Sequence, residues 1–69
     1  MNKSAIIKNA QAMGGDVGVR YKGENGVMVL WFDDVESAVA RMEKWDNDYP
    51  ELVELSLISW SGEVIYKVK

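Results

Sequence analysis

The chain contains neither cysteine nor histidine among its 69 residues. Without cysteine it forms no disulfide and no cysteine-based zinc site. Without histidine it lacks the commonest general base and the commonest transition-metal ligand. Ser59 and Ser61 therefore have no histidine that could activate either of them as a nucleophile. The sequence predicts a protein that is not an enzyme and that uses no cofactor and no metal.

Long apolar runs are also missing. No stretch approaches the roughly 20 apolar residues that span a bilayer, and the N-terminal residues do not resemble a secretory signal. Together with the lack of cysteine, this predicts a soluble cytoplasmic protein with no membrane partner. One proline and six glycines leave no flexible linker, so we expect a single domain over residues 1–69.

Motifs for phosphate and calcium binding are incomplete. The glycines form neither a phosphate loop nor a dinucleotide-binding fingerprint. Asp46-Asn47-Asp48 begins like a calcium-binding loop, but Tyr49-Pro50 interrupts it and the required glycine is absent. A solvated loop at the end of a helix is the better interpretation of this segment.

Hydrophobic periodicity predicts two helices, over residues 3–13 and 33–45. The apolar stripes are Ile6, Ala10 and Met13, with Ile7 beside them, and then Val35, Ala38, Val39, Met42 and Trp45. Asn2 or Ser4 can cap the first helix. Asp33 or Asp34 can cap the second, where Asp33 and Glu36 have capping-box spacing. Gly14-Gly15 ends the first helix, and the turn-forming residues 46–50 end the second.

Two β-hairpins are predicted, over residues 17–32 and 52–69. Asn25-Gly26 favours a type I′ turn, which pairs Lys22 with Val29 and Tyr21 with Leu30. A two-residue turn at Ser61-Gly62 pairs Ile58 with Ile65, Leu57 with Tyr66 and Ser56 with Lys67. The order α-β-β-α-β-β indicates an α+β fold, a mostly antiparallel four-stranded sheet packed with two helices. The predicted core is Ile6, Ile7, Ala10, Met13, Val19, Tyr21, Leu30, Phe32, Val35, Ala38, Val39, Met42, Leu55, Leu57, Val64 and Tyr66.

These registers give the sheet one face for the core and one outer face. The apolar residues of the outer face are Val27, Val29, Trp31, Ile58, Trp60 and Ile65. If both helices cover the core face, the outer residues form an exposed patch typical of an interface. If the helices cover opposite faces, or one hairpin folds over, the same residues are core. We take Val29, Trp31, Ile58, Trp60 and Ile65 as a candidate partner-binding or dimer surface.

The net charge of −3 is unevenly distributed. Residues 33–54 carry −6 and the rest of the chain carries +3. The candidate acidic binding residues are Glu36, Glu43, Asp46, Asp48 and Glu51, which we expect to face a basic surface of another protein. The alternative is that these acids are a solvated helix face that keeps the protein soluble.

The sequence thus predicts a small binding protein, a stoichiometric inhibitor or adaptor of the type that phages and mobile elements encode. Its acidic surface would dock on a larger protein, which could be one that handles nucleic acid. One alternative is a structural subunit that self-associates as a homodimer. Another is a single-stranded nucleic-acid-binding module that uses Arg20 and Lys22 beside Trp31. The isoelectric point near 4.7 and the lack of a basic cluster argue against nucleic acid as a partner.

Overall fold

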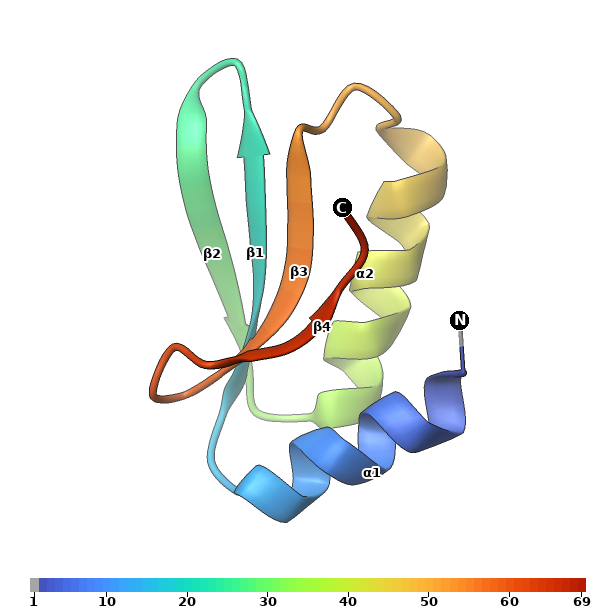
Figure 1. The fold of residues 1–69 in the computed structure, drawn as a ribbon, viewed down its shortest axis with the longest axis vertical. Helices are drawn as coiled ribbons and strands as arrows, with labels where there is room; N and C mark the ends of the chain where they lie inside the picture. The colour runs from blue at the N-terminus through green and yellow to red at the C-terminus, as the bar shows by residue number, and fades with distance from the viewer. Residues whose placement is uncertain (1) are drawn as a thin grey trace.

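The computed structural model describes residues 2–69 as two layers, a four-stranded sheet and a pair of helices. The elements are α1 (Lys3–Met13), β1 (Val17–Gly23), β2 (Gly26–Phe32), α2 (Val35–Asp48), β3 (Glu54–Ser59) and β4 (Val64–Lys67). Figure 1 shows α2 running alongside the strands, while α1 crosses near one end of the sheet on the same side. The predicted α+β class and the order of its elements are confirmed.

Short polar side chains set the start of each helix. Asn2 caps α1, because its side-chain oxygen accepts a hydrogen bond from the N–H of Ala5 at 3.2 Å. Asp34 caps α2 in the same way through the N–H of Ser37 at 3.2 Å. The predicted bounds of α1 are confirmed, and the predicted capping box at Asp33 is wrong.

The second helix ends three residues later than predicted, at Asp48. The polar residues 46–48 can continue a helix even though they are common in turns. Pro50 cannot continue it, and it disfavours the helical conformation of Tyr49. The end of α2 is therefore set by the proline rather than by the acidic residues before it.

The strands pair in the order β2-β1-β3-β4, and every pairing is antiparallel. Each hairpin contributes one central strand and one edge strand. The central strands β1 and β3 pair with each other, which joins the two hairpins into one sheet. The edge strands are β2 and β4, at opposite sides of the sheet.

The register of the first hairpin differs from the predicted one by two residues. Tyr21 pairs with Met28 instead of Leu30, and the turn consists of Glu24 and Asn25. Within residues 2–69 no residue other than glycine has a positive φ, so this is not a type I′ turn. Gly26 supplies a positive φ of 99° directly after the turn. A shift of two residues leaves every side chain on its predicted face.

The second hairpin contains a β-bulge that the sequence did not reveal. Leu57 pairs with Tyr66 as predicted, but Ile58 pairs with Val64 instead of Ile65. The extra residue in β4 reverses the alternation of side chains at this point. Val64, predicted to be core, is therefore 57% exposed, whereas Ile65, predicted to lie on the outer face, packs against the core.

The core lies between the helices and one face of the sheet, which we call the inner face. Its largest fully buried side chains are Met42, Leu55, Leu57, Val17, Val19 and Val39. Two further predicted core residues are exposed. Met13 stands at the last position of α1, and Leu30 stands on the edge strand β2, so each has neighbours on one side only.

Candidate functional site

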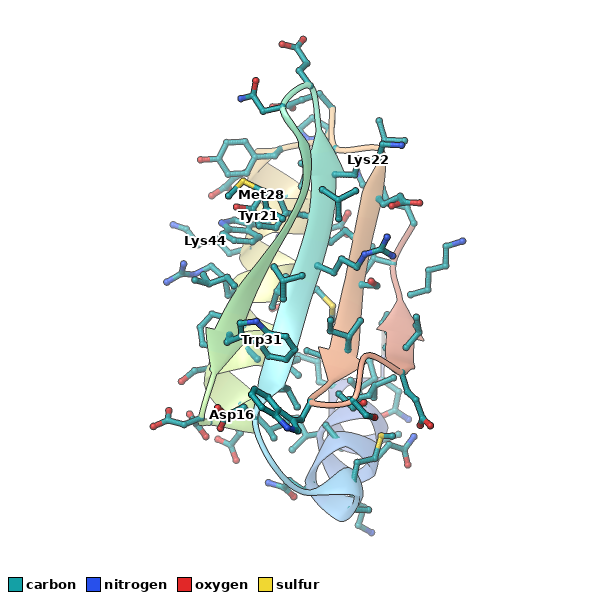
Figure 2. All side chains as sticks on the ribbon, turned by 90° about the vertical axis from the view of Figure 1, so that its left-hand side faces the viewer. Asp16, Tyr21, Lys22, Met28, Trp31 and Lys44 are labelled. Carbon is teal, nitrogen blue, oxygen red and sulfur yellow. The ribbon has the colours of Figure 1, made fainter. Side chains whose placement is uncertain are left out.

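The opposite face of the sheet, here called the outer face, is covered by neither helix of residues 2–69, and in Figure 2 it is turned toward the viewer. The strand pairings place Trp31, Gly18, Ile58 and Val64 in one apolar row that crosses all four strands. The next row is more polar and contains Val29, Arg20, Ser56 and Lys67. Of the two arrangements left open by the sequence, the structure has both helices on one face.

Two tryptophans form an aromatic patch at one end of the outer face. The ring centroids of Trp31 and Trp60 lie 5.4 Å apart in an edge-to-face arrangement. Gly18 makes room for this arrangement, because a Cβ on Gly18 would lie 2.6 Å from a methyl of Val29 and 3.1 Å from the Trp31 ring. Trp31 therefore lies over the backbone of β1, as Figure 2 shows. The two residues stay 42% and 67% exposed, respectively.

The predicted apolar surface is smaller than expected. Trp31 and Trp60 are exposed, and Val29 is half-buried beside them. Ile58 lies on the outer face but is only 6% exposed, because it stands in a central strand with neighbours on both sides. Ile65 faces the core because of the bulge in β4. Of the five predicted residues, Ile58 and Ile65 are thus unavailable to a partner.

The edge strand β2 is an apolar surface that the sequence analysis did not single out. Its seven residues, Gly26–Phe32, include no charged side chain. Val27 and Trp31 are exposed on the outer face, and Met28 and Leu30 are exposed on the inner face. An uncharged run of strand-forming residues was visible in the sequence. The strand order that leaves this run at an edge was not.

The acidic residues are divided between two flanks of α2 and the segment after it. Glu43 faces α1, where its carboxylate lies 3.3 Å from the Nζ of Lys3. Asp46 lies 3.9 Å from the Nζ of Lys69 near the end of the chain. Asp48 lies on the other flank, 3.7 Å from the Nζ of Lys44. The remaining two, Glu36 at the start of α2 and Glu51 after it, are exposed.

These ion pairs leave the acidic character of the region in place. All three are solvent-exposed, and exposed pairs contribute little to stability. Residues 33–51 have seven acids and two bases, a charge of −5, and counting Lys3 and Lys69 with them gives −3. Glu54 does not belong to this region, because it lies in β3 on the outer face, 3.8 Å from Arg20. The basic side chains Arg20, Lys22 and Lys67 of the sheet lie on the outer face, away from α2. Negative charge is thus concentrated on α2 and the segment after it, whereas α1 carries Lys3 and Lys8 and no acid.

The described residues contain no arrangement suited to metal binding or nucleophilic catalysis. Within residues 2–69 no three acidic side chains are close enough to hold a metal ion. The Ser59 hydroxyl lies 3.0 Å from that of Ser61 and accepts a hydrogen bond from the N–H of Glu63 at 3.1 Å, so it stabilises the turn. None of the helices in this part of the chain is both long and apolar enough to cross a bilayer.

Comparisons with known proteins identify no relative. No protein-family model matches the sequence, and no curated protein or solved structure matches it either. The surfaces described above are therefore the only basis for a function: the acidic helix layer, the aromatic patch and the uncharged edge strand.

Proposed function

We propose that this chain is a small, non-enzymatic binding protein that acts in the cytoplasm as a stoichiometric inhibitor or adaptor. Its acidic helix layer would dock on a basic surface of a larger protein. The observation that supports this proposal is the concentration of acidic side chains on one element of the helix layer. Acidic side chains gather on α2 and the segment after it, whereas the basic side chains of the sheet lie on the far face.

A concentrated negative surface has two physical consequences for binding. It accelerates the encounter with a positively charged cleft, and salt weakens this effect because the Debye length is about 8 Å at physiological ionic strength. The contribution appears mainly in the association rate. If the partner handles nucleic acid, the carboxylates of Glu36, Glu43 and Asp46 would stand where phosphates otherwise bind.

The test compares association rates with a partner captured from the source cells. In the first variant, Glu43, Asp46 and Asp48 are changed to their amides. In the control, Asp16, Glu24 and Glu63, the three acids outside residues 33–54, are changed to theirs, which gives the same net charge. We expect the first variant to associate more slowly and with a weaker dependence on salt than the control. Equal rates for the two variants would contradict docking through the acidic layer.

A second candidate function is a self-associating structural subunit. The exposure of Trp31 and Trp60 on a face that neither α1 nor α2 covers favours this alternative. Two such faces could meet about a two-fold axis, the commonest symmetry of oligomers. Trp60→Lys would then weaken the dimer. A wild-type protein that stays monomeric at high concentration would exclude this function.

A further inference from the structure

The two edges of the sheet differ in how well they are protected from pairing with another strand. The edge strand β4 has only four residues, and its pairing with β3 contains a bulge. It ends at Lys67, and two further charged residues, Glu63 and Lys69, lie just outside it. Shortness, bulges and charges are the devices that protect natural edges. The edge strand β2 has seven residues, no charge and no bulge in its pairing with β1. Only the β2 edge is therefore open to a further strand.

The backbone of β2 presents unpaired hydrogen-bonding groups at this edge. The carbonyl of Lys22 accepts a hydrogen bond from the N–H of Val53 at 2.9 Å, so it points away from β2. Lys22 and its neighbour Val27 are consequently a non-hydrogen-bonded pair of the hairpin. Hydrogen-bonded and non-hydrogen-bonded pairs alternate along an antiparallel hairpin. The backbone N–H and C=O groups of Val27, Val29 and Trp31 therefore point away from β1, out of the edge of the sheet.

We propose that β2 pairs in antiparallel fashion with β2 of a second copy of this chain, about a two-fold axis at Val29. Val29 then pairs with the partner's Val29, and Val27 pairs with the partner's Trp31 by their outward backbone groups. On the inner face, Met28 lies opposite the partner's Leu30. The two four-stranded sheets become one sheet of eight strands.

This register is self-complementary, which is why a second copy is the occupant. In this register the partner's strand covers all four exposed side chains of β2, and each of them lies opposite another apolar side chain. The four are Val27, Met28, Leu30 and Trp31. Within the paired strands no like charges come together, because β2 has no charged residue. Cations flank the strand on both sides. Arg20 and Lys22 of β1 stand opposite Val29 and Val27, one strand away from the proposed contact, and Arg20 pairs with Glu54. Arg41 lies 5.7 Å from the Phe32 ring, and Lys44 pairs with Asp48.

The edge is separate from the acidic surface that faces α1. Glu43 and Asp46 contact Lys3 and Lys69, on the side of α2 away from β2. An edge dimer therefore leaves these acids open to a larger partner. The dimer and the docking function can fail independently of each other.

The lack of natural cysteine allows a cross-linking test. In the proposed dimer the Cα atoms of the two Val29 residues are about 5.5 Å apart, within disulfide range. We expect Val29→Cys to form a disulfide-linked dimer readily under mild oxidation. Val64→Cys is the control, because Val64 is exposed on the outer face beside the other edge. Equal or faster cross-linking of the control would overturn the proposal.

Light scattering with three proteins tests the dimer without a cross-link. The wild type should show twice the monomer mass of 7.8 kDa. Val29→Pro removes an outward N–H from each copy and leaves the pairing with β1 intact. We expect it to raise the dimer Kd by about tenfold or more, since two inter-chain hydrogen bonds are lost. Val64→Lys charges the outer face and should leave the dimer unchanged.

Two results of these light-scattering measurements would overturn the edge dimer. A wild type that is monomeric at its highest soluble concentration excludes it. Loss of the dimer in Val64→Lys with retention in Val29→Pro would show contact through the outer face. If Val29→Pro does not fold, Val29→Lys replaces it, because it puts two like charges opposite each other at the two-fold axis without changing the backbone.

Discussion

Asp34 shows how a single side chain determines where an element begins. Its carboxylate accepts hydrogen bonds from both the N–H and the hydroxyl of Ser37, the latter at 2.6 Å. The hydrogen bond from the Ser37 side chain is the main reason that the pKa of Asp34 lies below its ordinary value of 3.8. Asp33, one residue earlier, makes no capping contact. From the sequence the two were equivalent candidates, because both are acids at the start of a helix.

We expect Asp34→Ala to lower the Tm by about 5 °C through loss of the N-cap. Asp33→Ala removes the same charge from the same helix end and keeps the cap, so its effect should be smaller. Thermal unfolding followed by circular dichroism measures both. Equal losses of Tm would mean that charge near the helix end matters and the hydrogen bonds do not.

The effect of Asp34→Ala should also depend on pH. Because the folded-state pKa of Asp34 is lowered, its stabilising contribution is complete above pH 3.8. It is lost as the pH falls from 3.8 through the lower pKa of the folded state. The Tm difference between the wild type and Asp34→Ala should therefore shrink in this window. A constant difference down to the acid end would contradict the hydrogen-bonded carboxylate.

Gly18 is the residue on which the aromatic patch depends. Any side chain there would meet Val29 and the Trp31 ring, so Gly18→Ala should destabilise the fold by about 1–3 kcal/mol and displace Trp31. Gly23→Ala is the control in the same strand, since its Cβ would meet only Leu52 at an ordinary 3.7 Å. Denaturant unfolding and tryptophan fluorescence measure both effects. Equal stability of the two variants would argue against close packing over Gly18.

At the scale of elements, the sequence specifies which face of a helix or strand is apolar better than it specifies which residues of two strands pair. The bounds of α1 and the two faces of the first hairpin were predictable, because periodicity and alternation depend on every residue of an element. The register of that hairpin was not, because Asn25-Gly26 can occupy either of two positions in a turn. Gly26 follows the turn instead of forming its second central residue.

The bulge in β4 is the feature that sequence reasoning could not supply. Val64 and Ile65 are both strand-forming apolar residues, so nothing in their chemistry indicates which one faces the core. The choice depends on the geometry of the turn, where the Ser59 hydroxyl accepts from the N–H of Glu63. One extra residue was enough to exchange a core position and a surface position.

The bulge can be tested by truncating its two neighbouring apolar residues. Ile65→Ala should cost about 1–2 kcal/mol, because Ile65 packs partly buried against the core. Val64→Ala should change stability by no more than about 0.5 kcal/mol, because Val64 is exposed. Urea unfolding gives both values. A larger cost for Val64→Ala would indicate that β4 keeps the regular alternation.

For the whole molecule, size decides which surfaces stay open. A chain of 69 residues supplies two helices, and both are used on one face of the sheet. The sequence left open whether the tryptophans of the outer face are exposed or core, and the position of both helices on the inner face decides that they are exposed. The open β2 edge was not predictable, because strand order depends on how the hairpins join, and a local sequence pattern does not report it.

An edge dimer makes the stability of the whole molecule depend on concentration. Association stabilises the folded state by mass action, so the Tm of the wild type should rise with protein concentration. Val29→Pro should show a Tm that does not change over the same range. Scanning calorimetry at several concentrations measures both. A wild-type Tm that is independent of concentration would contradict the dimer.

The central strand β1 has one neighbour close in sequence and one far away. Its pairing with β2 is closed by two residues, whereas its partners in β3 lie 32 to 42 residues further along the chain. Closing that longer loop costs more chain entropy, and non-local pairing slows folding. Both hairpins can form early as local units. We therefore expect the meeting of β1 with β3, which also brings α2 over the inner face, to be the step that limits the rate of folding.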